Sequence, residues 1–183
     1  MLARLEENDG GDTVRETLEI INQMQSDGVI GKYAIGGAVG AAFYVEPSTT
    51  FDLDIFVLMP ASTGALITLS PIYDYLSKRG CSPEAEHIVI AGWPVQFLSA
   101  SNTLEEEAIE EAVSTEVDGV PTQIMPPEHL IAIALRTGRP KDHLRILQFV
   151  DQKMFDMDKL TSLLQKHGLF AKWKAFQERY GSN

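Results

Sequence analysis

The apolar residues near the start of the chain recur at intervals of three or four, a spacing that predicts an amphipathic helix. These residues are Val14, Leu18, Ile21 and Met24. Thr13 and Glu16 have the spacing of a capping box, so we expect the helix to begin at Thr13. We expect it to end at Gly28, because glycine commonly terminates a helix.

Short runs of apolar and β-branched residues follow, separated by segments with helical spacing. We expect strands over residues 29–35, 53–59, 87–90, 95–98 and 122–125. Helices are expected over residues 38–44, 70–80 and 104–113. The third and fourth strands flank Ala91-Gly92-Trp93-Pro94, which predicts a hairpin. A hairpin beside strand–helix–strand connections makes the predicted sheet mixed.

From Pro127 onward the apolar residues recur at helical intervals, which predicts a helical C-terminal section. We therefore predict an α/β (α+β) fold, with a mixed sheet of about four to six strands flanked by helices. Residues 1–126 form the predicted core, and residues 127–183 form a helical section packed on it. Glycine and proline do not accumulate enough to mark a flexible linker, so we expect one compact unit.

Charge is unevenly distributed along the chain. Its 183 residues carry a net charge of −11, which excludes wrapping of nucleic acid by a basic surface over the whole molecule. Residues 1–135 contain 5 basic and 21 acidic residues, whereas residues 136–183 contain 10 basic and 5 acidic ones, a net charge of +5. Local contact between this last section and nucleic acid stays open.

Cysteine usage and hydropathy predict where the protein resides. The single cysteine, Cys81, cannot form an intramolecular disulfide or build a zinc site by itself, which favours a reducing compartment. The longest uncharged apolar stretch, residues 33–45, is shorter than the roughly 20 residues of a membrane helix. The acidic first residues lack the layout of a signal peptide. We expect a soluble cytoplasmic protein.

A glycine pair and a pair of aspartates carry the most chemical information. Gly36 and Gly37 stand between a predicted strand and a predicted helix, where the main chain can approach a phosphate closely. Asp52 and Asp54 stand two apart at the start of the next strand, so both point to one face while Leu53 points to the other. Two neighbouring carboxylates repel unless a cation or a proton lies between them. This pattern predicts a Mg²⁺ site.

The same Asp-x-Asp pattern occurs again at Asp156 and Asp158. Because this second pair lies between predicted helices, we expect it to cap a helix and to be exposed to solvent. The surroundings of the first pair, and not the three-residue pattern itself, therefore distinguish it as a metal site.

Other residues with possible chemical roles have simpler structural interpretations. His87 and His129 lie beside apolar runs and are expected to be structural, since neither has a second histidine at helical spacing. The glutamates of residues 105–111 are expected to form the solvated face of a helix.

Three basic residues gather around Gly138-Arg139-Pro140, where a helix must break: Arg136, Arg139 and Lys141. Two interpretations stay open for them. They either complement the end of a helix, or contact a triphosphate or a nucleic acid.

Two segments taken together resemble a known superfamily. Tyr33-Ala-Ile-Gly36-Gly37-Ala-Val-Gly40 is followed by Phe51-Asp52-Leu-Asp54-Ile-Phe-Val57. This order resembles the nucleotidyltransferase superfamily, in particular its minimal bacterial members near the AbiEii/AbiGii toxin family. Residues 92–98 and 128–142 also look like later blocks of that family, so the resemblance spans residues 33–149.

The resemblance implies transfer of a nucleotide from an NTP to a hydroxyl acceptor with Mg²⁺, with pyrophosphate leaving. It implies that Asp52 and Asp54 are the catalytic metal ligands. It also implies nucleotide binding by Gly36 and Gly37 with the following Ala38, and we expect the basic residues Arg136, Arg139 and Lys141 to bind the nucleotide as well. A toxin–antitoxin or phage-defence activity, an RNA acceptor such as tRNA, and a homo-oligomer or an antitoxin partner are further implications.

The chain departs from the family pattern at several positions. Ala38 stands where a Ser or Thr often helps to hold phosphate, and Gln96 stands where a third carboxylate is expected. Ala134 and Arg145 replace a common lysine and a common aspartate. Glutamine can orient an oxygen but cannot act as a base. Either two carboxylates suffice with help from elsewhere, such as Glu86 on a neighbouring strand, or the protein binds a nucleotide or a partner without turnover.

Overall fold

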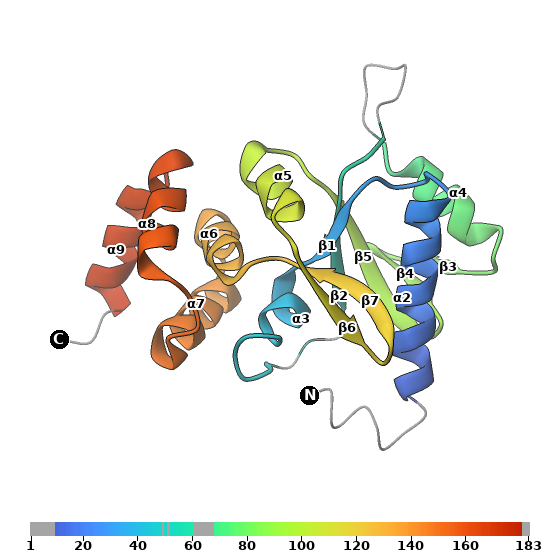
Figure 1. Cartoon of the computed structure of the whole chain (residues 1–183), viewed down its shortest axis with the longest axis horizontal. Coiled ribbons are helices and arrows are strands. Elements are labelled where there is room, and N and C mark those ends of the chain that lie inside the picture. The colour runs from blue at the N-terminus through green and yellow to red at the C-terminus, as the bar shows by residue number, and fades with distance from the viewer. Residues whose placement is uncertain (1–9, 49, 51, 61–67, 181–183) are drawn as a thin grey trace.

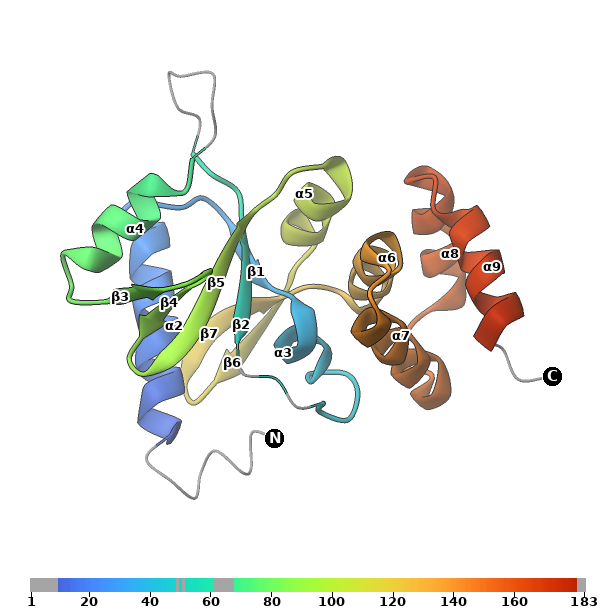
Figure 2. The same ribbon diagram turned by 180° about the vertical axis from the view of Figure 1, so that it is seen from behind.

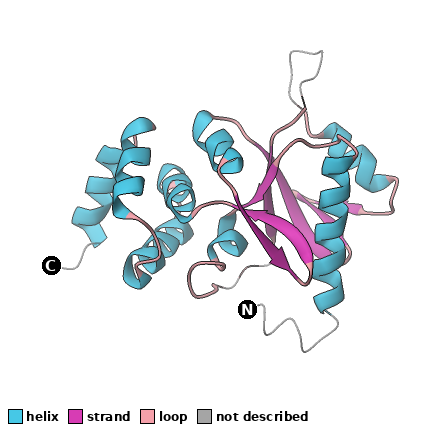
Figure 3. Cartoon of the chain, viewed as in Figure 1, coloured by secondary structure: helices cyan, strands magenta, loops and turns pink. Residues whose placement is uncertain are grey.

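The computed structural model describes residues 10–48, 50, 52–60 and 68–180. Its strands are β1 (Tyr33–Ile35), β2 (Leu53–Val57), β3 (Ser82–Glu84), β4 (His87–Ile90), β5 (Trp93–Ser99), β6 (Val113–Val117) and β7 (Val120–Ile124). Its helices are α2 (Gly10–Ser26), α3 (Gly37–Ala41), α4 (Ser70–Ser77), α5 (Thr103–Glu110), α6 (Pro127–Thr137), α7 (Pro140–Gln152), α8 (Met157–Lys166) and α9 (Phe170–Tyr180). Up to β7 the chain mixes helices with single strands and with the runs β3–β5 and β6–β7, and the described elements after β7 are helices (Figure 3).

The strands form one mixed sheet in the order β3-β4-β5-β2-β1-β7-β6. The central strands β1 and β2 are antiparallel, whereas β2 with β5 and β1 with β7 are parallel. The remaining pairs are antiparallel hairpins. The predicted mixed α/β fold is confirmed, with a seven-stranded sheet in the described part of the chain instead of about four to six strands.

Side-chain alternation along β2 divides the core into two parts. Leu53, Ile55 and Val57 are buried on the face of the sheet that α2 and α4 cover. Phe56 is buried on the opposite face, in a cluster with residues of α5, α6 and α8. The two views of the chain show α2 and α4 on one side of the sheet and α3, α5 and α6 on the other (Figures 1 and 2). Asp54 lies between Leu53 and Ile55, so it shares the second face with Phe56.

The helical C-terminal part follows directly from β7. Gly138, whose φ is +69°, caps the C-terminal end of α6, and α7 begins at Pro140, so the predicted helix break is present. Helices α8 and α9 contact α6 and lie at the end of the molecule remote from α2 (Figure 1). The division into units at residue 126 stays a proposal. Among the described residues, we find no helix with the length and apolar character that a membrane crossing requires.

Two local predictions were wrong. Helix α2 is already formed before Thr13, and the Thr13 carbonyl accepts a hydrogen bond from Thr17 Oγ1 at 2.8 Å. The helix predicted over residues 104–113 ends at Glu110, and Val113 instead pairs with Ile124 in the β6–β7 hairpin. Pairing in the hairpin, which turns at Asp118 and Gly119, overrides the local helical spacing there. Strand β1 and helix α3 are shorter than predicted.

Candidate active site

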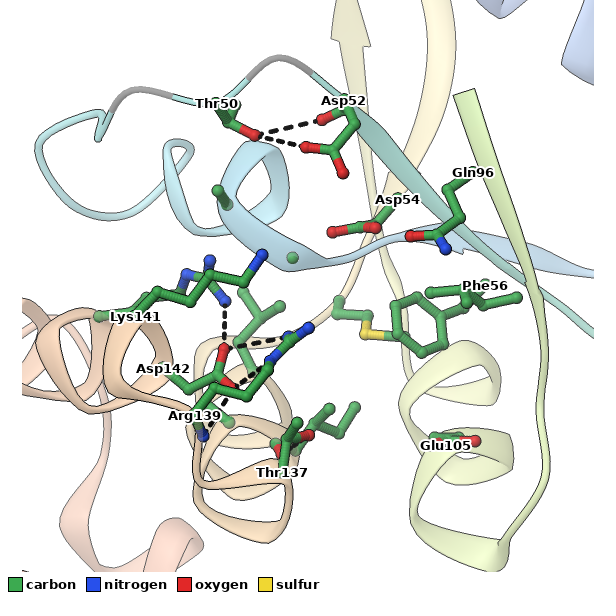
Figure 4. A pocket seen from close by; sticks show the side chains of 18 of the residues that line it. Thr50, Asp52, Asp54, Phe56, Gln96, Glu105, Thr137, Arg139, Lys141 and Asp142 are labelled. Atoms are coloured by element: carbon green, nitrogen blue, oxygen red, sulfur yellow. Dashed lines mark hydrogen bonds and ion pairs between the residues drawn. The ribbon is translucent and has the colours of Figure 1, made fainter. Parts of the chain in front are cut away.

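A cavity of about 330 Å³ lies between the face of β2 and β5 that carries Asp54 and the helices α6 and α7. Its carboxyl-bearing residues are Asp52, Asp54, Glu105 and Asp142, and its cationic residues are Arg139, Lys141 and Arg145. Gly37, Ala38, Gln96 and Ala134 also line it. In Figure 4, Asp54 and Gln96 lie side by side on one wall, and Arg139 and Lys141 lie across the cavity from them.

The two aspartates of the first Asp-x-Asp pair share one face of β2. Both line the cavity, whereas Leu53 between them is buried on the other face. Strands β2 and β5 pair in parallel, and the register places Gln96 opposite Asp54. The spacing therefore predicted the common direction of the carboxylates correctly. The position where the family resemblance implies a third carboxylate also lies at this site, and a glutamine occupies it.

The glycine turn lies directly against Asp54. The Gly36 amide donates a hydrogen bond to the Asp54 main-chain carbonyl at 3.0 Å. A Cβ atom on residue 37 would lie only 1.7 Å from Asp54 Oδ2, and Gly37 has a φ of +57°, which residues with side chains rarely adopt. Glycine at position 37 therefore allows the main chain to approach the Asp54 carboxylate.

Asp54 is held in an unfavourable place for a negative charge. Burial raises its pKa above the ordinary value of 3.8, and the charge of Asp52 raises that pKa further. The cationic groups of Arg145 and Lys141 lower the pKa of Asp54 without cancelling these effects. A desolvated carboxylate beside a second carboxylate is stabilised by a cation between them.

Asp52 is more exposed, and two neighbours fix the orientation of its carboxylate. Thr50 Oγ1 donates to Asp52 Oδ1 at 2.9 Å, and His87 Nε2 lies 3.3 Å from Asp52 Oδ2. Burial raises the pKa of Asp52, but the hydrogen bonds from Thr50 and His87 and the charge of Lys141 outweigh that effect and lower the pKa below 3.8. Asp52 is therefore ionised at neutral pH.

Asp142 organises the cationic wall of the cavity. Its side chain is 1% exposed, and it accepts hydrogen bonds from Arg139 Nε at 2.8 Å and from Arg145 Nη1 at 3.4 Å. The Arg139 main-chain amide also donates to Asp142 Oδ2 at 3.2 Å. The first turn of α7 is a favourable place for a negative charge because of the helix dipole. One buried carboxylate thus holds two guanidinium groups at the cavity wall.

Arg145 has an unused hydrogen-bond donor. Its side chain is 12% exposed, and its Nε atom is buried without a hydrogen-bond partner among the described residues. A buried donor left without an acceptor costs about 1–3 kcal/mol. Arg145 also lines the cavity, so its positive charge lies close to any anion bound there.

Three predicted site residues do not line the cavity. Gly36 lies behind it, since a Cβ atom there would meet the Phe56 ring at 2.6 Å. Arg136 points elsewhere and donates to Asn102 Oδ1. Glu86 was predicted to lie on a neighbouring strand, but it is exposed in the turn between β3 and β4. The prediction for Glu86 failed because β4 begins one residue later.

Sequence reasoning did not assign several residues to this site. His87 was interpreted as structural, yet it contacts Asp52, which is 35 positions earlier in the chain. No local pattern could reveal that contact. Asp142 had a local signal, because a carboxylate in the first turn after Arg139-Pro140 is well placed to bind the arginine. Thr50 also had one, since it lies two residues before Asp52.

Comparison with known proteins gives a likeness at the level of the fold. No protein-family model matches the sequence, and no similar curated protein is found. An antigenic nucleotidyltransferase-like protein from Paracoccidioides brasiliensis superposes with a TM-score of 0.53 and 14% identity, over 90% of this chain and 93% of that one. Two structures of ANT(2'')-Ia are also similar. The solution structure of this antibiotic-resistance factor gives a TM-score of 0.46 and 16% identity, over 92% of this chain and 94% of that one. The crystal structure of ANT(2'')-Ia in complex with adenylyl-2''-tobramycin gives a TM-score of 0.45 and 14% identity, over 90% of this chain and 98% of that one.

The likeness to the Paracoccidioides brasiliensis protein extends over almost the whole of both chains. The identity is too low to carry over an activity, but the arrangement of strands and helices corresponds. This chain therefore has the fold of a nucleotidyltransferase-like protein.

Proposed function

We propose that this protein is a Mg²⁺-dependent nucleotidyltransferase that transfers a nucleotide from an NTP to a hydroxyl group. The observation that carries the proposal is that one cavity holds both Asp52 and Asp54 and, across from them, cationic side chains. These are Lys141 and Arg145 of α7 and Arg139, which caps the N-terminal end of α7. The cavity volume, about 330 Å³, lies at the lower end of the range for small-molecule sites. The nucleotidyltransferase-like fold is consistent with this function.

The donor atoms of the cavity fit a hard divalent cation. Asp52 and Asp54 supply carboxylate oxygens, the ligand type that Mg²⁺ prefers, and the raised pKa of Asp54 indicates that its charge lacks compensation. We propose these two aspartates as the residues that hold Mg²⁺. When bound, Mg²⁺ supplies charge neutralisation for the triphosphate and lowers the pKa of an attacking hydroxyl.

The cationic wall is suited to the charge that develops on the leaving pyrophosphate. Arg139 and Lys141 would bind phosphate oxygens, and Asp142 holds the Arg139 guanidinium in place before a substrate arrives. Donors fixed in advance stabilise developing charge without reorganisation during the reaction. We assign further phosphate contacts to the main chain at Gly37 and Ala38, which line the cavity beside Asp54.

The acceptor and the biological role form the finer part of the proposal. The net charge of +5 over residues 136–183 favours a nucleic acid acceptor such as tRNA. The resemblance to the AbiEii/AbiGii toxin family motivates a toxin–antitoxin or phage-defence role, with an antitoxin or a second copy of the chain as partner. The single cysteine, Cys81, motivates a cytoplasmic location.

A catalytically degenerate protein that binds a nucleotide or a partner is the second candidate. Gln96 favours it, because an amide stands opposite Asp54 where the family resemblance implies a carboxylate. The alanines at positions 38 and 134 also remove polar groups that the resemblance would imply. This candidate predicts NTP binding without release of pyrophosphate.

Binding and turnover measurements separate these candidates. Isothermal titration with Mg²⁺ and each of the four NTPs tests the site, and incubation with labelled NTPs and total RNA tests the acceptor. We expect Mg²⁺-dependent NTP binding, which Asp52→Asn and Asp54→Asn abolish, and labelled RNA as the product. Folded protein that binds none of the four NTPs would contradict the enzyme and the nucleotide-binding form of the second candidate, and would leave only its partner-binding form. Binding without labelled RNA or released pyrophosphate would favour the second.

A further inference from the structure

A second group of ionisable side chains lies between α5 and α6, near the end of α8, and lines a different cavity from that of Asp52 and Asp54. Figure 1 shows α6 between α5 and α8. Glu107 lies on α5, Glu111 at its C-terminal end and His129 on α6. Each offers one ligand atom, and these atoms lie within 4.8 Å of one another. All three residues line a separate cavity of about 820 Å³. Their proximity depends on the packing of α5 against α6.

His129 is buried without the partners that a buried imidazole requires. It is 3% exposed, and neither ring nitrogen has a hydrogen-bond partner among the described residues. The approach of Glu107 Oε1 to His129 Nε2, at 4.0 Å, is too long for a hydrogen bond. An unsatisfied buried polar group costs about 1–3 kcal/mol. The ring therefore lies in a cavity beside two carboxylates with its hydrogen-bonding capacity unused.

We propose that Glu107, Glu111 and His129 bind one divalent transition-metal ion of the zinc type. One imidazole nitrogen with carboxylate oxygens is a donor set that suits zinc, whereas Mg²⁺ takes oxygen ligands. In a tetrahedral site with bonds of about 2.1 Å, ligand atoms lie about 3.4 Å apart. The ligand atoms lie within 4.8 Å of one another, so the three side chains need to draw together by up to about 1.4 Å to bind the ion.

The protonation state of His129 is compatible with this site. Burial lowers the pKa of His129 below its ordinary value of 6.5, although the charges of Glu111 and Glu107 act in the opposite direction. The direction of this shift favours the neutral imidazole, which is the form that binds a metal ion.

Two residues at the C-terminal end of α8 contact the Glu107 carboxylate, and they affect metal binding in different ways. His167 Nε2 lies 2.7 Å from Glu107 Oε2 and orients the carboxylate, whereas the other oxygen, Oε1, faces His129. Lys166 Nζ lies 2.8 Å from Glu107 Oε1, the same oxygen that faces His129. The Lys166 side chain is 62% exposed, so it is able to turn into solvent. Lys166 is therefore a competitor of the metal, and a bound metal would tie α5 to α6 beside α8.

The test is titration of the chelator-treated full-length chain with ZnCl₂, CoCl₂ or MgCl₂ alone, followed by calorimetry and thermal unfolding. We expect one tightly bound Zn²⁺ per chain at this site, a higher Tm with Zn²⁺, and a visible absorption spectrum of four-coordinate Co²⁺. An excess of MgCl₂ should not displace Zn²⁺. Asp54→Asn should bind Zn²⁺ as the unmodified chain does, which separates this site from the cavity of the proposed activity.

Four substitutions make the assignment specific. Glu111→Gln should weaken Zn²⁺ binding by at least about 10-fold, whereas Glu106→Gln, an exposed position on the same helix, should not change it. His129→Leu should abolish the binding and leave the metal-free chain folded, because it removes two buried nitrogens without partners. Lys166→Met should tighten binding by about two- to fivefold, the value of an exposed ion pair.

The outcomes decide the proposal in either direction. Loss of Zn²⁺ binding in Glu111→Gln and His129→Leu, with tighter binding in Lys166→Met, supports it. A chain that binds no Zn²⁺, or Zn²⁺ binding that Glu111→Gln and His129→Leu leave unchanged, overturns it. Neither result depends on the proposed nucleotidyl transfer, since the readouts are metal affinity, Tm and Co²⁺ absorption.

Discussion

The chain contains the pattern Asp-x-Asp in two regions, and the fold uses it in two different ways. Asp54 lies in β2 and Asp52 immediately precedes that strand, and both side chains line a cavity. Asp156 is instead the N-terminal cap of α8, where its Oδ1 accepts hydrogen bonds from the main-chain amides of Asp158 at 2.9 Å and Lys159 at 3.0 Å. As predicted, this second pair is a cap exposed to solvent.

The difference arises from the geometry of the two elements. Residues two apart on a strand project to the same face, whereas residues two apart on a helix do not face each other. Burial raises the pKa of Asp54, while the hydrogen bond from the Lys159 amide lowers the pKa of Asp156. Identical short patterns therefore have opposite electrostatic consequences. The Asp54 carboxylate has little compensation for its charge, which a bound cation could provide. The Asp156 carboxylate already accepts hydrogen bonds from main-chain amides.

The prediction with the largest expected effect concerns whether the pair Asp52 and Asp54, and not the pair Asp156 and Asp158, is needed for turnover. Asp54→Asn should lower kcat/KM by at least about 10³-fold, equivalent to about 4 kcal/mol, because it removes a metal ligand on which NTP binding depends. Asp158→Asn should leave kcat/KM unchanged. The measurement is pyrophosphate release from labelled NTP with total RNA. Equal loss of activity in both variants would contradict the comparison.

The second prediction concerns the glycine turn that abuts Asp54. Gly168→Ala introduces a side chain at a φ of +68° with open space around it, so it should cost about 1–2 kcal/mol of unfolding free energy. Gly37 has a similar φ of +57°, but a side chain at this position would also displace the Asp54 carboxylate. Gly37→Ala should lower the unfolding free energy further, by about 1 kcal/mol or more, and abolish NTP binding. Urea denaturation and calorimetry measure these effects, and similar behaviour of both variants would contradict the close approach.

A third prediction restores the carboxylate that the family pattern implies. Gln96→Glu places a negative charge opposite Asp54, which should lower the stability of the metal-free chain by about 1 kcal/mol. Mg²⁺ should then raise Tm more in this variant than in the unmodified chain. Gln123→Glu, whose strand partner is Ser114, is the matched control and should gain no Mg²⁺ dependence. A Gln96→Glu chain that is insensitive to Mg²⁺ would argue against a metal beside Asp54.

The smallest expected effect is the pH dependence of stability in metal-free buffer. Because the pKa of Asp54 is raised on folding, its ionisation destabilises the chain as pH rises above 3.8 through the raised pKa. Asp54→Asn should therefore be more stable than the unmodified chain at about pH 7, and this gain should disappear at about pH 3.

Asp156 should show the opposite dependence. Its pKa is lowered on folding, so its contribution to stability is present above 3.8 and is lost as pH falls through the lowered value. Asp156→Ala should lower Tm at neutral pH and have a smaller effect in acid. Thermal unfolding across this pH range measures both trends, and parallel trends in the two variants would be inconsistent with the two environments.

Local patterns predicted much of the architecture and part of the candidate site. The mixed sheet, the hairpin of β4 and β5, and the helix break before Pro140 followed from alternation and turn residues. The common direction of Asp52 and Asp54 followed from strand geometry. Strands β3 and β6 were missed, because short and largely exposed edge strands carry a weak hydrophobic pattern.

The contacts that complete both polar clusters could not be predicted in the same way. His87 reaches Asp52 because β4 lies beside β5, which pairs with β2. His129 reaches Glu107 because α6 packs on α5. Both histidines were interpreted as structural, since their neighbours in sequence are apolar. Their polar neighbours come from other elements of the fold.

The sequence by itself determined which residues project together from one element, because backbone periodicity fixes the direction of each side chain relative to its neighbours. It thereby determined the aspartate pair, the glycine turn and the cap of α8. The tertiary structure decided what lies across from each of them: the cationic wall opposite Asp54, and the buried His129 beside two glutamates. The physical reason is that charge and burial act through space, so the environment of a carboxylate depends on elements that are distant in the chain.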